Sequence, residues 1–232
     1  MKTKIITVPG FHGSDVKHWQ TWLERQLPGS ERVSGIDWER PQILTWARAI
    51  EKHIDAKPER VILVAHSFGC LASALVASRY PEKVAGLILV APASPQRFSL
   101  TGPIGVNFGS ENDISSYLPK QRLQTLGLLV ASTNDPWMEL GQSEEFGRQW
   151  GMSLYNAGNA GHINSEAGYG EWPLIKQWVT TIQDAVASFQ GDEPQFAKGI
   201  KQRAAAPQNA PWQSLYPSQI KIRHRGARQR TP

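Results

Sequence analysis

Short, continuous apolar runs alternate with amphipathic runs through the first 190 residues of the chain. Continuous runs rich in Val, Ile and Leu are typical of strands buried on both faces, whereas apolar positions three or four apart are typical of helices that cover a sheet. We predict strands at 4–8, 32–37, 60–65, 84–91, 126–132 and 151–157, and helices at 15–27, 41–54, 68–79, 137–148 and 171–189. Because strands that alternate with helices pair in parallel, the expected fold is α/β: a three-layer sandwich with a parallel sheet of about six strands between helices.

Local signals mark several of these boundaries. Ser14 or Asp15 is a suitable cap for the first helix, and Pro41 and Pro173 suit the first turns of the second and last helices. The run at 32–37 is a weak strand, because it contains Ser-Gly.

The last part of the chain, residues 191–232, differs in composition. It is rich in Gln, Pro, Ala and Arg, and it carries eight Lys or Arg against two acidic residues, a net charge of +6. The remaining residues hold 17 basic and 18 acidic side chains, so the basic character of the protein belongs to this segment. We expect one folded domain over residues 1–190 and a basic tail over 191–232 that is disordered or loosely docked.

Composition and spacing also exclude several classes of protein. The single cysteine, Cys70, excludes an internal disulfide. The apolar run 5–8 is too short for a signal-peptide core, and no run approaches the length of a membrane span, so we expect a cytoplasmic protein. The loop at 9–14 lacks both the Gly-rich dinucleotide fingerprint and a Walker lysine, and no His, Cys or carboxylate cluster has metal-ligand spacing. We therefore expect no cofactor and no metal.

A candidate nucleophile follows the third predicted strand, in Ala65-His66-Ser67-Phe68-Gly69. A nucleophile elbow needs a strand, a tight turn and a helix, with small residues flanking the turn because the backbone is pinched there. Ala65 stands where the pattern usually has Gly, a difference of one methyl group. The simpler alternative is that Ser67 only caps the helix, but capping does not explain the small residue on each side of the turn.

An acid and a base follow in the order that this architecture requires. The order is Ser, then Asp or Glu, then His, each just past the end of a strand. Asp135 follows the strand at 126–132, and His162 follows the strand at 151–157. The other candidates fit this order less well: two carboxylates without a strand to aim them and histidines that precede the serine or lie in the tail (Asp113, Asp184, His12, His18, His53, His66 and His224).

Four blocks of the sequence carry a resemblance to a known family. They read VPGFHGSDVKHWQTWLE, IDWERPQILTWARAI, VILVAHSFGCLASALVA and, in two parts, ASTNDPW and AGHINSEAGYGEWP. In this order they resemble the α/β-hydrolase superfamily, and more narrowly the small serine hydrolases related to retinoblastoma-binding protein 9. The resemblance implies a compact hydrolase without a large lid, with esterase activity on small acyl esters. It places Ser67, Asp135 and His162 at the triad positions.

The chemistry of ester cleavage adds further expectations. The oxyanion of the tetrahedral intermediate needs preorganised donors, and we predict the backbone N–H of Phe68 and that of Phe11, with His12 as second choice for the latter. Aromatic residues beside these positions are the expected walls of the substrate pocket: Phe11, Trp38, Phe68 and Trp137. The segment 98–108 is a candidate for closing that pocket.

A second hypothesis comes from another class of function. The chain would then be a protein-binding module that retains an inherited, little-used triad. The basic tail is a separate candidate contact for an acidic partner, nucleic acid or an anionic membrane surface, although a solvated terminal extension is the favoured interpretation. The favoured interpretation is a carboxylesterase that acts on a small-molecule ester.

Overall fold

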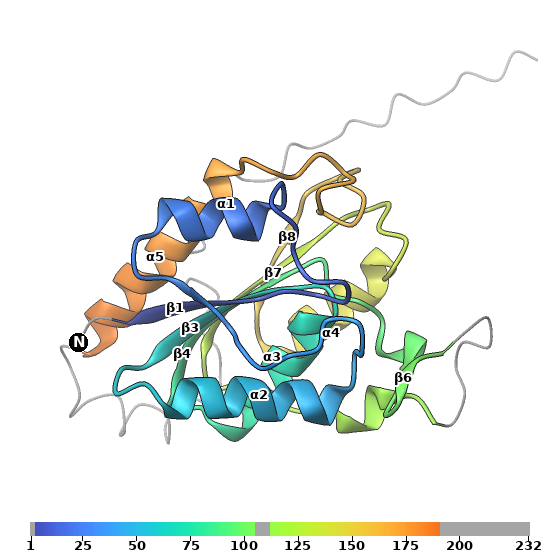
Figure 1. Cartoon of the computed structure of the whole chain (residues 1–232), viewed down its shortest axis with the longest axis horizontal. Helices are drawn as coiled ribbons and strands as arrows, with labels where there is room; N and C mark the ends of the chain where they lie inside the picture. Colours follow the sequence, from blue (N-terminus) through green and yellow to red (C-terminus); the bar gives the residue numbers. More distant parts are fainter. Residues whose placement is uncertain (1–2, 105–111, 191–232) are drawn as a thin grey trace, which may run out of the picture.

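A six-stranded parallel sheet forms the centre of the molecule (Figure 1). The computed structural model describes residues 3–104 and 112–190. The strands lie in the order β2 (Glu31–Arg32), β1 (Lys4–Val8), β3 (Val61–His66), β4 (Val84–Val90), β7 (Leu126–Ala131) and β8 (Ser153–Asn156), and each neighbouring pair is parallel. This arrangement confirms the predicted α/β class and the sheet of about six strands.

Helices cover both faces of the sheet (Figure 1). One face packs against α1 (Trp19–Gln26) and α5 (Pro173–Gln190). The other packs against α2 (Ile43–Asp55), α3 (Phe68–Arg79) and α4 (Leu140–Trp150). Because alternate residues of each strand enter one core or the other, the central strands have no polar face, which is why they appear in the sequence as continuous apolar runs.

The strand order reverses between β1 and β3. From β1 the chain moves outward to β2, returns to β3 on the other side of β1, and then proceeds outward through β4, β7 and β8. In open α/β sheets, ligands bind beyond the carboxyl ends of the strands at such a switch point. The topology therefore predicts a ligand site at the loop that follows β1 and the turn that follows β3.

Four of the five predicted helices begin two to four residues later than expected: α4 begins at Leu140 rather than about 137, and α5 at Pro173 rather than 171. The first helix begins at Trp19, because the cap is His18, whose Nδ1 accepts from the backbone N–H of Gln20 at 3.2 Å. Neither Ser14 nor Asp15 caps it. Pro41 precedes the cap residue Gln42 of the second helix, rather than lying in its first turn.

Two strands are shorter than predicted. The run at 32–37 contributes only Arg32 to β2; the N–H of Val33 still donates to the carbonyl of Thr7 at 2.9 Å, and the chain has left the extended conformation by Gly35, whose φ is 77°. β8 is an edge strand whose residues alternate between half-buried and exposed, so it is not buried on both faces as the central strands are.

Short elements connect β4 to β7. They are η1 (Pro95–Arg97), a hairpin of β5 (Phe98–Ser99) and β6 (Gly102–Pro103), and η2 (Ile114–Tyr117). Part of the segment 98–108, proposed from the sequence to close the pocket, lies outside the described residues. So does the basic tail, with its candidate contact to an acidic partner.

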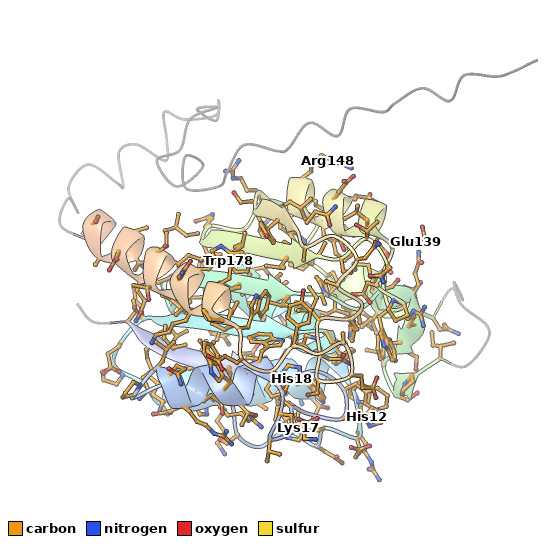
Figure 2. All side chains as sticks on the ribbon, turned by 90° about the horizontal axis from the view of Figure 1, so that it is seen from above. His12, Lys17, His18, Glu139, Arg148 and Trp178 are labelled. Carbon is orange, nitrogen blue, oxygen red and sulfur yellow. The ribbon has the colours of Figure 1, made fainter. Side chains whose placement is uncertain are left out.

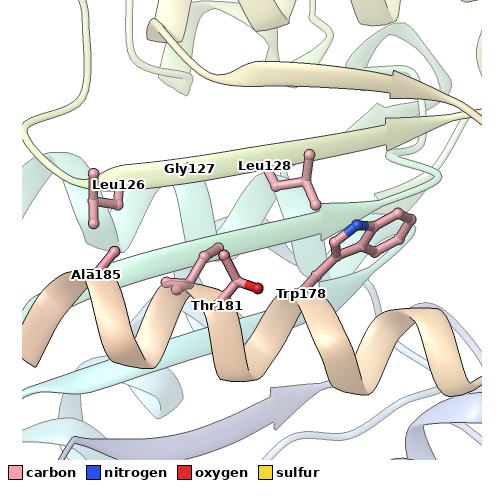
Figure 3. Close-up of a pocket in the computed structure, with 7 residues that line it drawn as sticks. Leu126, Gly127, Leu128, Trp178, Thr181 and Ala185 are labelled. Atoms are coloured by element: carbon pink, nitrogen blue, oxygen red, sulfur yellow. The ribbon is translucent and has the colours of Figure 1, made fainter. Parts of the chain in front are cut away.

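A small pocket lies where α5 crosses the sheet (Figure 3). Its volume is about 30 Å³, and its lining is mainly apolar: Leu126, Gly127, Leu128, Trp178, Thr181, Ile182 and Ala185. Leu126 is the first residue of β7, so the pocket lies at the amino end of that strand. It is therefore remote from the carboxyl edge to which the strand order points.

Candidate active site

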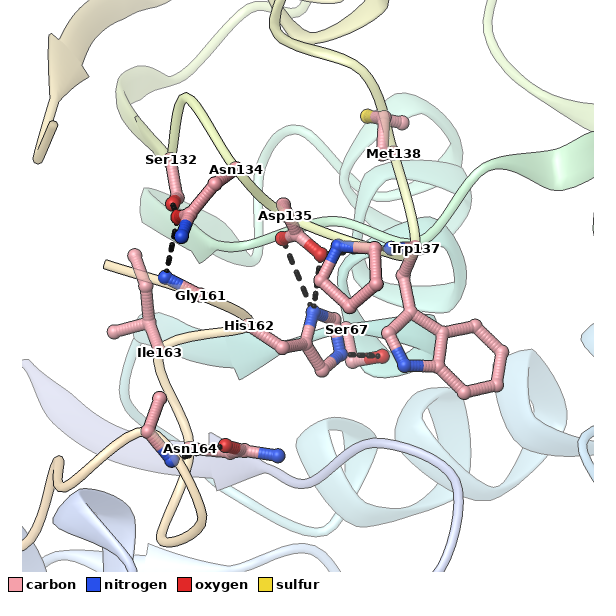
Figure 4. Close-up of polar contacts among 12 residues, drawn as sticks. Ser67, Ser132, Asn134, Asp135, Trp137, Met138, Gly161, His162, Ile163 and Asn164 are labelled. Atoms are coloured by element: carbon pink, nitrogen blue, oxygen red, sulfur yellow. Dashed lines mark hydrogen bonds and ion pairs between the residues drawn. The ribbon is translucent and has the colours of Figure 1, made fainter. Parts of the chain in front are cut away.

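Ser67, His162 and Asp135 meet at the carboxyl edge of the sheet (Figure 4). The imidazole Nε2 of His162 lies 2.8 Å from the Oγ of Ser67, and its Nδ1 lies 2.9 and 3.0 Å from the two carboxylate oxygens of Asp135. Because a carboxylate oxygen only accepts, Nδ1 carries the proton and Nε2 accepts from the serine hydroxyl. Ser67 is 5% exposed and His162 8%, so the contacts are largely shielded from water.

The turn at Ser67 has the strained backbone of a nucleophile elbow. Ser67 has φ 53° and ψ −124°, a conformation that residues other than Gly rarely adopt, between the end of β3 and the start of α3. The methyl group of Ala65 fits in the buried core. At Gly69, in contrast, a Cβ would lie 2.3 Å from the carbonyl oxygen of Pro9. The second small position therefore requires Gly, whereas the first tolerates Ala.

Ser67 occupies the cap position of α3, but its side chain makes no capping hydrogen bond. Its hydroxyl faces His162 instead (Figure 4). The alternative that this serine is only a helix cap therefore does not describe what the side chain does.

The loop after β1 packs directly against the serine. A Cβ on Gly10 would lie 2.6 Å from the Cβ of Ser67. The backbone N–H of His12 donates to the carbonyl of Trp38 at 3.0 Å, so it is already paired, which corrects the prediction of His12 as an oxyanion donor. Within the part of the chain that the structure describes, the N–H groups of Phe11 and Phe68 have no protein acceptor. Phe68 is also the first residue of α3, where the helix dipole favours negative charge.

The turn that carries His162 is tied to the loop that carries Asp135 (Figure 4). The side-chain oxygen of Asn134 accepts from the N–H of Gly161 at 2.7 Å, and the hydroxyl of Ser132 accepts from the N–H of Ala160 at 3.0 Å. Our interpretation of the sequence missed both residues. The polar run Ser-Thr-Asn immediately before Asp135 was the available signal.

The predicted aromatic walls divide into two groups. Trp137 is half-buried, and its ring centre lies 5.7 Å from that of His162. Phe11 is also half-buried and stacks on His12 at 3.7 Å. The ring of Phe68, in contrast, is wholly buried among core aromatics, which corrects its prediction as a pocket wall and leaves only its backbone N–H as a candidate donor.

Trp38 lies beside the β1 loop. It is half-buried, packs edge-on against Trp46 with ring centres 5.2 Å apart, and faces Gly13. Near it, exposed His12 pairs with Glu39 through an Nδ1 to Oε2 distance of 2.8 Å. Figure 2 shows His12 with Lys17 and His18 on the connection between β1 and α1.

Neighbouring titratable groups are held neutral by burial. Burial, the charge of His162 and that of His18 keep the pKa of His66 well below its ordinary value. Burial raises the pKa of the Cys70 thiol well above its ordinary value, and the Sγ donates to the carbonyl of Val90 at 3.4 Å. Cys70 is therefore an inert core thiol rather than a rival nucleophile.

The part of the chain that the structure describes contains neither a candidate metal site nor a candidate membrane-spanning helix. Across residues 3–104 and 112–190, no three His, Cys, Asp or Glu side chains gather closely enough to hold a metal ion. Nor does any helix in those ranges have both the length and the apolar character that crossing a bilayer requires.

A family model described as serine hydrolase matches residues 5–187. The chain belongs to the serine hydrolase family. A search of curated proteins finds no match. The hydrolase resembles the crystal structure of a YdeN-like hydrolase from Pectobacterium atrosepticum, with 32% identity and a TM-score of 0.70 over 80% of this chain and 92% of that one.

More distant solved structures share the fold of this serine hydrolase. The ydeN gene product of Bacillus subtilis is 19% identical, with a TM-score of 0.58 over 78% of this chain and 98% of that one. Est1E from Butyrivibrio proteoclasticus, solved with ferulic acid, is 15% identical, with a TM-score of 0.55 over 81% and 88% of the two chains. The family model and the YdeN-like hydrolase confirm the resemblance to the α/β-hydrolase superfamily, and these more distant structures agree with its fold. The narrower likeness to hydrolases related to retinoblastoma-binding protein 9 stays a prediction.

Proposed function

We propose that this serine hydrolase is a carboxylesterase that cleaves small carboxylic esters through an acyl-enzyme intermediate on Ser67. The observation that carries the proposal is the continuous contact from the Ser67 hydroxyl through the His162 imidazole to the Asp135 carboxylate. The strained turn at the serine and the membership of the family support it.

His162 acts first as a base and then as an acid. As the Oγ of Ser67 bonds to the ester carbonyl carbon, its proton moves to Nε2. The carbon–alkoxide bond then breaks, and Nε2 returns the proton to the departing alcohol. Water attacks the acyl-enzyme by the same route, which releases the acid and restores Ser67. Asp135 holds Nδ1–H in place and stabilises the imidazolium in both halves of the reaction.

The oxyanion binds to two backbone N–H groups, those of Phe68 and Phe11. Both lack a protein acceptor among the described residues, and Gly10 brings their two loops into contact. Loss of one such donor typically lowers the rate about 100-fold to 1000-fold.

The acyl or aryl group of the ester packs against apolar rings. Trp137 is next to His162, and Phe11 and Trp38 lie on the β1 side of the site. Flat aromatic walls suit a short acyl or aryl group, so the substrate class is a small ester. Cysteine usage, one residue in the whole chain, favours the cytoplasm as the compartment.

Labelling with a fluorophosphonate tests the nucleophile. Wild type, Ser67→Ala and His162→Ala would be treated with the reagent, and hydrolysis of p-nitrophenyl esters of rising acyl length and of an aryl ester such as methyl ferulate would be followed. We expect labelling and turnover in wild type and loss of both in the two variants. Ser73→Ala is the matched control: Ser73 lies on α3 and its buried Oγ has no partner among the described residues, so this variant should label normally.

The binding-module alternative predicts a different result. A folded wild type that resists labelling and hydrolyses none of these esters would overturn the esterase proposal. The protein-binding module would then be the favoured function.

A further inference from the structure

Two consecutive carbonyl groups at the His162 turn accept hydrogen bonds from buried ring N–H groups. The carbonyl of His162 accepts from Nε2 of His66 at 2.9 Å, and the carbonyl of Ile163 accepts from Nε1 of Trp19 at 2.9 Å. Because a carbonyl oxygen only accepts, the proton of the His66 ring is on Nε2. His66 is 4% exposed and Trp19 is fully buried, so water does not compete for either bond.

The turn needs such support because its backbone is unfavourable. Ile163 has a φ of 48°, a left-handed conformation that is rare for a β-branched residue. Its side chain is fully buried in the same core cluster as Trp19. Residues held in this conformation persist where the surroundings over-determine them, and they gather at functional sites.

We propose that His66 and Trp19 are positioning residues that fix the backbone of His162, so that the imidazole meets Ser67 and Asp135 together. The inference rests on the proposed function, because it assigns these residues a part in the same catalysis. Neither residue contacts the reacting atoms: each acts through a carbonyl of the turn. His66 links the base to the nucleophile: its side chain bonds to the backbone of His162, and its own backbone continues directly into Ser67.

The His66 ring suits this task because it stays neutral. It packs edge-on against His18 and lies 4.8 Å, between ring centres, from His162. Burial is the main cause that keeps its pKa well below the ordinary value, followed by the charges of His162 and His18. A neutral imidazole has a single N–H, and in His66 this N–H donates to the carbonyl of His162. His66 therefore does not compete for the proton that His162 transfers.

The structure contains a matched control. Trp150 is also fully buried, and its Nε1 donates to the carbonyl of Pro119 at 2.9 Å. This bond has the same length and type as that of Trp19, but its acceptor is 43 positions from His162 in the sequence. The Pro119 carbonyl also accepts from Nε2 of Gln149 at 2.6 Å, so it keeps one partner when the indole N–H is removed. Trp19→Phe and Trp150→Phe each remove one indole N–H and keep an aromatic ring.

The experiment compares wild type with His66→Phe, His66→Gln, Trp19→Phe and Trp150→Phe in the full chain. Urea unfolding gives stability, and p-nitrophenyl acetate hydrolysis gives kcat and KM separately. We expect both Trp variants to lose stability, Trp150→Phe no more than Trp19→Phe because Gln149 still pairs the Pro119 carbonyl. Only Trp19→Phe and His66→Phe should lose about tenfold to 100-fold in kcat, with KM nearly unchanged. His66→Gln, whose amide can donate, should recover part of kcat.

Equal kcat losses in Trp19→Phe and Trp150→Phe, or wild-type kcat in His66→Phe, would overturn the inference. If His66→Phe does not fold, the comparison of Trp19→Phe with Trp150→Phe still tests the inference. NMR of the downfield Nδ1–H proton of His162 separates this inference from the proposed function, because it requires no turnover. The signal should be sharp in wild type and Trp150→Phe and should broaden or vanish in Trp19→Phe. A signal unchanged in Trp19→Phe would contradict the inference even in a chain that cleaves no ester.

Discussion

The imidazole of His162 and the hydroxyl of Ser67 are 2.8 Å apart, although 95 positions separate the residues in the sequence. The contact forms because β3 and β8 both end at the same edge of a parallel sheet. In the proposed reaction, His162 can accept the serine proton at Nε2 only if its ring carries the other proton on Nδ1. The hydrogen bond to Asp135 favours that tautomer.

Asp135→Asn should therefore lower kcat by about 10⁴-fold while the fold is retained. The amide oxygen can still accept from the N–H of Trp137, which the carboxylate does at 2.8 Å, so the local loop should persist. The amide group can, however, present N–H to Nδ1 and so favour the wrong tautomer. Steady-state hydrolysis of p-nitrophenyl acetate, with circular dichroism as the check on folding, measures both effects. Activity within tenfold of wild type would argue against Asp135 as the orienting acid.

Gly10→Ala should disable the site through sterics alone. The added methyl carbon would lie 2.6 Å from the Cβ of Ser67 and 3.3 Å from its Oγ, so the nucleophile or the β1 loop must move. We expect kcat/KM to fall about 100-fold and the free energy of unfolding to drop by about 1 to 3 kcal/mol.

Gly141→Ala is the control for that substitution. Gly141 lies in α4, and a Cβ there meets nothing within 4 Å. Alanine favours helix over glycine by about 1 kcal/mol, so this variant should be as active as wild type and at least as stable. Similar losses in both variants would show that the β1 loop has no special fit to the serine.

The ends of apolar strands predicted the candidate site from the sequence, but the residues that support its backbone could not be predicted in this way. Asp135 and His162 could be predicted because each follows a strand, and parallel topology brings strand ends together. The bond from Trp19 to the carbonyl of Ile163 spans 144 positions and ends on backbone, which has no residue-specific signal. The sequence likewise could not predict that the Phe68 ring enters the core, because a residue in a turn can face either the core or the site.

The first helix shows a second limit of sequence patterns. Ser14 and Asp15 have the side chains that usually cap helices, yet the cap is the ring nitrogen of His18. Histidine is an uncommon cap, and it serves here because burial keeps the ring neutral with an acceptor available. Helix α3 was predicted with its observed bounds, Phe68–Arg79, because the elbow defines where it starts.

Asn134→Ala should weaken the hold on the His162 turn. The substitution removes the acceptor for the N–H of Gly161 and a contact to the hydroxyl of Ser132. We expect the free energy of unfolding to fall by about 1 kcal/mol and kcat to fall by about tenfold, because the residue is exposed and water can replace part of the bonding. Thr133→Ala, which loses only a side-chain bond to Asn156, is the control and should keep wild-type kcat. A kcat for Asn134→Ala equal to that of the control would assign Asn134 no part in positioning.

Stability should fall as the pH is lowered from 6.5, and His18 should be one cause. Burial, and to a smaller extent the charges of Arg32 and His162, lower the pKa of His18 from 6.5 to about 4, against the opposing effect of Asp15. Between these values the unfolded chain binds the proton more readily than the folded chain does, so stability rises with pH across this window and is lost on acidification. Protonation would also remove the Nδ1 acceptor that caps α1. The full shift corresponds to at most about 3 kcal/mol.

Urea unfolding from pH 6.5 to 4.5 measures this dependence in wild type and in His18→Asn. Asparagine keeps a capping oxygen but does not titrate, so the variant should be less stable at pH 7 and yet show a shallower loss on acidification. Some slope should remain, because the pKa of His66 is lowered by burial in the same direction. The window avoids Glu31, whose pKa is lowered from 4.5 to about 2 by its hydrogen bonds with Lys4 and Lys57 and which therefore loses its contribution only at lower pH. Parallel curves for the two proteins would mean that His18 takes up its proton without cost and that the ring is not held neutral by its surroundings.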